Sequence, residues 1–94
     1  MNNVIERIDK EEVSNIPFSK KDVLTHPDDI KTRLDNLHRS QTLGNLLQTK
    51  VKITFLSTDG KIYEVHTTVW AVGAEFVVLK GGITIPIRSI SRVE

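Results

Sequence analysis

The sequence predicts an α+β fold that is mainly β, with one helix at about residues 27–41 packed on a small five-stranded antiparallel barrel. Three observations support this prediction. Helix-start and helix-stop signals flank a single apolar stripe, the apolar period changes to two from residue 50 onward, and glycine-containing turns divide residues 50–94 into short runs. Closing so apolar a sheet into a barrel would leave no strand edge open to other chains.

Composition narrows the class of protein before any element is placed. The chain has 94 residues, a formal net charge of +1 and no cysteine. A chain of this length is expected to form one domain with a small core. The lack of cysteine excludes disulfides, thiolate catalysis and zinc–thiolate sites, and it favours a reducing, cytoplasmic compartment. The N-terminus lacks the apolar stretch of a signal peptide, and no apolar run reaches the ~20 residues of a membrane span.

The first 24 residues are expected to form a partly ordered tail, in which residues 1–14 are mobile. Four apolar side chains have imperfect spacing for a short amphipathic helix: Val4, Ile5, Ile8 and Val13. Pro17 interrupts any helix here because it pushes the preceding residue toward extended geometry. We expect Ile16 and Phe18 to pack onto the barrel, and residues 25–94 to form the single helix-plus-barrel domain.

The helix has clear boundary signals. Thr25 or His26 can act as the N-cap, and Pro27 suits a first turn. Two aspartates follow where the helix dipole favours negative charge. The stripe expected to face the barrel consists of Ile30, Leu34 and Leu37. Gly44 is the stop signal, which places the end of the helix near residue 41.

The first half of the β region combines a hairpin with one unusually long apolar run. The first strand alternates inward and outward residues, with Val51, Ile53 and Phe55 inward. Asp59-Gly60 is a strong signal for a hairpin turn. The following run, residues 62–72, is too long for one flat strand of a small barrel. We therefore expect it to bend and to serve two parts of the barrel.

The second half of the β region is expected to supply three short strands. Residues 76–79 form a continuous apolar run, and Gly81-Gly82 turns the chain back. Pro86 indicates an edge or a strand end because it cannot donate to a ladder. After a tight turn at residues 88–90, a last short strand is expected to end at Val93.

Residues 50–94 resemble the Sm-like family of small barrels. The likeness rests on the Asp59-Gly60 hairpin, the long bent second strand and the closing segment from Ile85 to Val93. The preceding helix fits that layout, and the helix-plus-barrel inhibitors of Rho-dependent termination are similar in length and element order. RNA-binding Sm rings usually present an aromatic residue and an asparagine in the turn that corresponds to residues 72–75. That turn is Val-Gly-Ala-Glu here. The whole chain also resembles a group of short bacterial proteins, a likeness that implies no function.

The sequence offers little that is typical of catalysis. The three histidines, at positions 26, 38 and 66, have no metal-ligand spacing, so no metal is expected. The aspartates of the helix fit a solvated first turn better than an acid–base pair, and no nucleophile elbow is present. Gly81-Gly82 is not followed by a helix that would make it a phosphate loop. We therefore expect no enzyme activity and no cofactor.

A binding module remains, with two alternatives. The first is a protein-interaction or regulatory adaptor, whose candidate surface is Trp70, His38 and Arg39. Trp70, the sole tryptophan, is either a partner-binding residue or part of the core or helix–barrel packing. The second is weak binding of RNA or another single strand through a basic barrel edge, with Lys50, Lys52, Arg88 and Arg92 as phosphate contacts. These cations are expected to cluster only if the first and last strands pair. No membrane contact is expected, and the sequence identifies neither the partner nor the oligomeric state.

Overall fold

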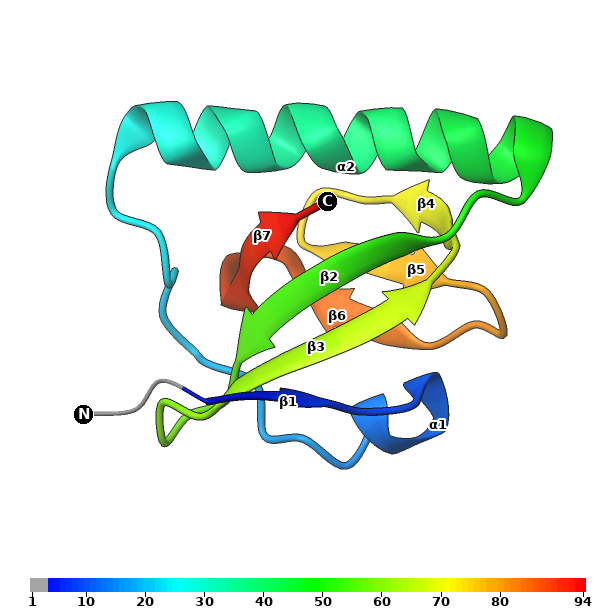
Figure 1. The fold of residues 1–94 in the computed structure, drawn as a ribbon. Helices are drawn as coiled ribbons and strands as arrows, with labels where there is room; N and C mark the ends of the chain where they lie inside the picture. The colour runs from blue at the N-terminus through cyan, green and yellow to red at the C-terminus, as the bar shows by residue number, and fades with distance from the viewer. Residues whose placement is uncertain (1–3) are drawn as a thin grey trace.

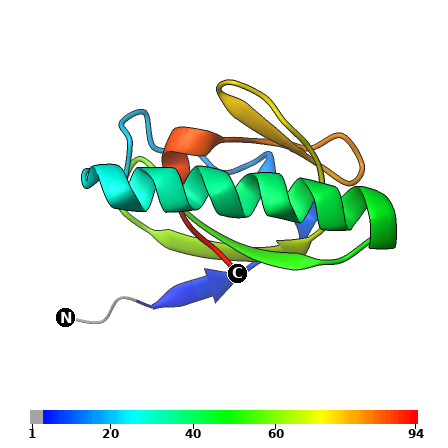
Figure 2. The same cartoon turned by 90° about the horizontal axis from the view of Figure 1, so that it is seen from above.

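The computed structural model describes residues 4–94. In chain order, the elements are β1 (Ile5–Arg7), α1 (Lys10–Val13), α2 (Pro27–Leu47), β2 (Val51–Leu56), β3 (Ile62–Thr67), β4 (Val69–Val72), β5 (Phe76–Leu79), β6 (Thr84–Pro86), the 3-10 helix η1 (Ile87–Ser89) and β7 (Ile90–Val93). Figure 1 shows α2 lying across one side of the strands, and Figure 2 shows it from above, running along them. Neither helix within residues 4–94 is both long and apolar enough to cross a membrane.

The strands form two sheets. The first sheet has the order β1-β3-β2-β7, and the second has the order β4-β5-β6. Among the strands of residues 4–94, only β1 pairs in parallel, with Ile5 opposite Ile62; the other strand pairs are antiparallel. An α+β fold that is mainly β, with one long helix, is confirmed. The strand pairs of the described residues do not form one continuous closed ladder.

The long apolar run bends as the sequence predicts. Residues 62–67 belong to the first sheet and residues 69–72 to the second, with the break at Thr68. Thr68 is buried at this corner, and its carbonyl accepts a hydrogen bond from the amide of Lys80 at 2.9 Å. The predicted Asp59-Gly60 turn is also present, because Gly60 has φ +84° between β2 and β3.

The core lies between the sheets and beneath α2. Its fully buried apolar side chains include Phe55, Leu37, Ile53, Leu79, Ile85, Ile90, Val13, Val65, Val69 and Val77. The inward positions of β2 are those that the alternation predicts. Leu37 is the only fully buried large side chain contributed by α2, so the strands supply most of the core.

The start of α2 is predicted correctly and its end is not. His26 is the N-cap, and its Nδ1 accepts from the amide of Asp28 at 3.3 Å. The helix continues through Gly44 to Leu47 and ends at Gln48, whose φ of 56° is left-handed. Gly44 is a contact residue because a Cβ there would lie 2.5 Å from the carbonyl oxygen of Val69. A larger residue would force the helix away from β4.

The buried stripe of α2 is also rotated from the predicted one. It consists of Arg33, Leu37, Ser40 and Gly44. Leu34 is 42 % exposed, and Ile30 is only half-buried. Arg33 takes the position on the inner face because its guanidinium pairs with Asp22, with both nitrogen–oxygen distances at 2.8 Å. The apolar period alone does not predict a buried arginine.

The N-terminal segment contributes more structure than a partly ordered tail implies. A short amphipathic helix through Val4, Ile5, Ile8 and Val13 is not present. Ile5 lies in a strand, Ile8 follows that strand, and the helical part of this segment is Lys10–Val13. Ile8 and Val13 are buried in the core. As predicted, Ile16 and Phe18 pack against the core, and the ring centroid of Phe18 is 5.6 Å from that of Phe55. Residues 1–3 lie outside the described part, and the rapid amide exchange expected of residues 1–14 stays a prediction.

Candidate functional site

Two of the four predicted phosphate contacts share the outer face of the first sheet. β2 pairs with β7, so the first and last strands of residues 50–94 are neighbours as expected. Lys52 and Arg92 lie on adjacent strands, where Arg92 is opposite Thr54 and Lys52 hydrogen-bonds through its backbone to Glu94. Their side chains therefore point to the same side, away from the inward-facing Ile53.

Carboxylates partly neutralise this charged face. Lys52 Nζ lies 3.9 Å from Glu64 Oε2, and Arg7 Nη2 lies 3.0 Å from Glu64 Oε1. Arg92 Nη2 lies 3.1 Å from Glu94 Oε2. The Arg92–Glu94 pair is exposed on both sides and contributes little to stability, whereas Glu64 is mostly buried; all three pairs reduce the net charge offered to a ligand. The face is a mixed surface and not a basic stripe.

Arg88 lies in a different place. It is exposed on η1 and borders a pocket of about 260 Å³, together with Asp22, Arg33, Glu75 and Phe76. Hydrogen bonds from Arg33 lower the pKa of the Asp22 carboxyl below its ordinary value. The Arg33 charge is thus already paired within the fold. Glu75 adds a second negative charge to this pocket, so its two arginines are balanced by two carboxylates.

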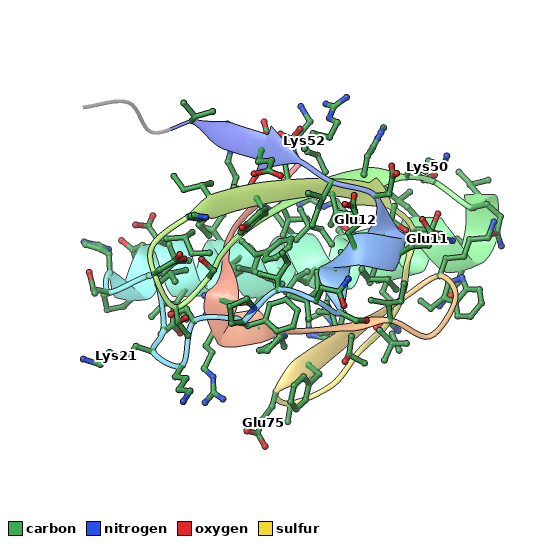
Figure 3. All side chains as sticks on the ribbon, turned by 90° about the horizontal axis from the view of Figure 1, so that it is seen from below. Glu11, Glu12, Lys21, Lys50, Lys52 and Glu75 are labelled. Carbon is green, nitrogen blue, oxygen red and sulfur yellow. The ribbon has the colours of Figure 1, made fainter. Side chains whose placement is uncertain are left out.

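Lys50 lies in a second pocket of about 260 Å³ that the sequence does not predict. We call it the lysine pocket. It is bordered by Arg7, Ile8, Asp9, Lys10, Glu11, Lys50, His66, Thr67, Thr68 and Lys80. Figure 3 shows Lys50 on the same side of the molecule as Glu11, and Lys21 at the far end. Of the four predicted phosphate contacts, only Lys50 borders this pocket.

Trp70 faces outward and not into the core. A register shift between Val69 and Ala71 places an extra residue, Trp70, in β4. Such a bulge turns neighbouring side chains to one side of a strand. Val69 is fully buried, whereas Trp70 is 43 % exposed. Of the two alternatives for this residue, the structure supports the exposed one.

Three apolar side chains continue the outer face of the second sheet from Trp70. Ala71 is opposite Val78, and Phe76 lies two residues from Val78 on the same strand, so these side chains share one face. Phe76 is 46 % exposed. We call Trp70, Ala71, Val78 and Phe76 the aromatic strip.

The other two predicted partner residues do not join this strip in one pocket. His38 and Arg39 are both exposed on α2. Arg39 borders a shallow groove with Val51 and Val93, on the side of the first sheet. The helix contacts β4 through other residues, since Gln41 Oε1 accepts from the amide of Val72 at 2.7 Å.

Nothing in the described part of the chain indicates a metal centre. Within residues 4–94, no three His, Asp or Glu side chains lie close enough to share an ion. His26 caps a helix, and His66 borders the lysine pocket. No family model, curated protein or solved structure matches the chain.

Proposed function

We propose that this protein is a non-enzymatic protein-interaction module whose partner binds the aromatic strip. One observation carries the proposal: Trp70 and Phe76 expose 43 % and 46 % of their surfaces on the same outer sheet face. Tryptophan and other aromatic residues are enriched where binding energy concentrates. Both side chains lie on hydrogen-bonded strands, and a pre-ordered backbone reduces the entropy lost on binding.

The size of the strip favours a short segment of another protein as its occupant. Taking ~200 Å² for a whole aromatic side chain, Trp70 and Phe76 together expose on the order of 200 Å². A stable interface between two folded proteins buries about 800 Å² on each partner. The strip fits one or two apolar side chains of an extended or helical peptide better than the flat surface of a second copy.

Selection from a random peptide library displayed on phage tests this proposal. We expect peptides with paired aromatic or large aliphatic residues to be enriched on the wild type. A Trp70→Thr/Phe76→Thr variant keeps β-favouring residues but removes the apolar contact, so affinity should fall at least tenfold, which corresponds to ~1.4 kcal/mol. Quenching or a blue shift of the single tryptophan's fluorescence should accompany binding to the wild type.

The matched control removes exposed apolar side chains elsewhere. Leu46 and Leu47 are 74 % and 71 % exposed near the end of α2. A Leu46→Gln/Leu47→Gln variant should bind the selected peptides as the wild type does. The proposal is overturned if no peptide is enriched, or if the strip variant and the control variant bind equally.

We also propose that residues 50–94 form a small barrel of the Sm-like type. The support is the order of the elements: β2, the bent pair β3 and β4, then β5, β6, η1 and β7, with β7 returning to β2. An experimental structure tests this, because a barrel requires backbone hydrogen bonds joining the two sheets on both sides. The barrel is contradicted if the experimental structure lacks more than one of the strand pairs needed to join the two sheets into a closed ring. The lack of cysteine supports a reducing, cytoplasmic location for this module.

The nucleic-acid alternative has weaker support at its four predicted residues. Lys52 and Arg92 are in ion pairs, and Arg88 shares a pocket with Glu75. Phosphate contacts need cations that a polymer can reach together. Of the four residues, only Lys50 belongs to a larger group of cations, because it borders the lysine pocket with Lys10 and Lys80.

A further inference from the structure

The lysine pocket brings together four segments that are distant in the sequence. Parallel pairing of β1 with β3 carries the segment after Arg7 to the far end of β3, where His66, Thr67 and Thr68 lie. Lys50 immediately precedes β2, whose first residue, Val51, is opposite Thr67. Lys80 is opposite Thr68 through the backbone hydrogen bond at the corner. The fold itself therefore fixes these positions; Lys50, His66 and Lys80 are exposed, whereas Thr67 and Thr68 are buried.

Three ammonium groups at this pocket have no carboxylate partner. Lys10, Lys50 and Lys80 make no ion pair within 4.0 Å among the described residues, whereas Lys31 and Lys52 both do. Four cationic and two carboxylate side chains border the pocket, which leaves a net charge of +2. Since Arg7 is already paired with Glu64, the positive charge available to a ligand comes from the three lysines, which exceed the two pocket carboxylates, Asp9 and Glu11, by one charge.

The ammonium of Lys10 lies close to the turn that follows Lys80. Its Nζ lies 3.8 Å from the position that a Cβ on residue 81 would occupy. Gly81 has φ +93°, a conformation that glycine adopts without strain. The turn after Lys80 therefore lies next to the Lys10 ammonium, and both lysines border the same pocket. An anion bound in the pocket would reduce the repulsion between its cations.

We propose that the lysine pocket binds a compact oligophosphate: pyrophosphate, tripolyphosphate or the phosphate chain of a nucleoside di- or triphosphate. The pocket, at about 260 Å³, is smaller than the ~300–1,000 Å³ of pockets that enclose whole ligands, so it accommodates the phosphates and leaves the rest outside. Three unpaired lysines that border one pocket match several charges on adjacent phosphorus atoms. A nucleic-acid backbone carries one charge per nucleotide and would place few of its charges in so compact a site.

Isothermal titration calorimetry with defined anions tests the site. The probes are sulfate, pyrophosphate, tripolyphosphate, ATP and a single-stranded oligouridylate. We expect tripolyphosphate to bind at least tenfold more tightly than sulfate. Similar affinities for ATP and tripolyphosphate would show that the phosphate chain is the ligand, and tighter binding of ATP would show that the nucleoside contributes. Backbone amide NMR signals of Lys10, Thr68 and Lys80 should shift first on titration.

Two triple variants with equal charge change separate site binding from general charge attraction. Lys10→Gln/Lys50→Gln/Lys80→Gln should weaken tripolyphosphate binding at least tenfold. Lys20→Gln/Lys21→Gln/Lys61→Gln removes three exposed lysines that do not border the pocket, and its affinity should stay within twofold of the wild type. Equal weakening in both variants overturns the proposal. Binding of the oligouridylate more tightly than tripolyphosphate, with lysine dependence, also overturns it and assigns the site to a nucleic acid.

Discussion

The two halves of α2 are attached to the strands by different interactions. In the N-terminal half, Arg33 is buried against β7 and donates to Asp22 at 2.8 Å and to the carbonyl of Ile90 at 2.9 Å. In the C-terminal half, Gly44 lies against β4, where an added Cβ would come within 2.5 Å of the Val69 carbonyl oxygen. One attachment depends on charge, and the other depends on the absence of a side chain.

Because of this difference, a change in charge should weaken the packing of one half of α2, and a change in side-chain volume should weaken the packing of the other half. The Arg33 attachment should be sensitive to charge and to acid, because its partner is a carboxylate. The Gly44 attachment should be insensitive to both and sensitive to volume alone. Four substitutions or conditions separate the two halves.

Asp22→Asn should have the largest effect on stability. It leaves the guanidinium of Arg33, which is 95 % buried, without its counter-charge. Removing one partner of a buried pair costs ~3–5 kcal/mol; we expect about 3 kcal/mol because Asp22 itself is 36 % exposed. Urea unfolding measures the loss. Asp35→Asn is the control because its pair with Lys31 is exposed and contributes ~0.3–0.5 kcal/mol. Equal losses in the two variants would show that Arg33 does not depend on Asp22.

Gly44→Ala should destabilise the protein by about 2 kcal/mol. Overpacking costs ~1–3 kcal/mol, and the higher helix propensity of alanine returns at most ~1 kcal/mol. Thermal and urea unfolding measure the change. Asn45→Ala, one residue further and exposed, should be neutral or slightly stabilising. A stabilised Gly44→Ala variant would show that α2 can move away from β4 at little cost.

Replacing the charged pair with uncharged residues should cost less than breaking it. In Asp22→Ser/Arg33→Met, the methionine fills apolar space and the serine can still accept from the amide of Leu24, as Asp22 does at 2.9 Å. We expect a loss of about 1 kcal/mol, since isosteric apolar replacement of buried pairs is often close to neutral. If the double variant were less stable than Asp22→Asn, the ion pair would stabilise the fold by more than the apolar burial that replaces it.

Acid should weaken the Arg33 attachment in a narrow range of pH. The hydrogen bonds from Arg33 lower the pKa of Asp22 below its ordinary value of 3.8. The unfolded chain then binds a proton first, so this stabilisation is complete above pH 3.8 and is lost as the pH falls through the lower folded pKa. The free energy of unfolding should fall more steeply with acid in the wild type than in Asp22→Asn. If the free energy of unfolding depended on pH equally in the wild type and in Asp22→Asn, the Asp22–Arg33 pair would not be the source of the acid sensitivity. Gly44→Ala keeps that pair, so its stability should fall with acid as steeply as that of the wild type.

Local signals predict the parts of this fold that depend on neighbouring residues. The His26 cap, the Pro27 first turn and the Asp59-Gly60 hairpin are present because each is set by backbone geometry within a few positions. The bend in residues 62–72 is also predictable, since a long apolar run in a small domain must turn. These elements require no knowledge of what packs against them.

The sequence does not predict features that depend on distant contacts. Gly44 carries the same local signal as a helix stop, and only the proximity of Val69 shows its real role. The sequence does not predict the lysine pocket because Lys10 and Lys80 are 70 positions apart and come to the same pocket through the parallel pairing of β1. One signal was available: lysines placed just before or after strands, at Lys50 and Lys80, lie where loops gather at one end of a sheet.

The parallel pairing of β1 has a consequence for how the chain acquires its structure. Ile5 is opposite Ile62, so 57 positions separate the partners. During synthesis at ~5–20 residues per second, β1 therefore waits about 3–11 s for its partner to be made. Contacts of such long range form late because the intervening chain must first be ordered.

The β2–β3 hairpin, whose partners are only 6 positions apart at Leu56 and Ile62, can form without β1. The docking of the N-terminal segment is thus the step that completes the lysine pocket, and folding intermediates that lack it should contain the strands of the core before they contain the site.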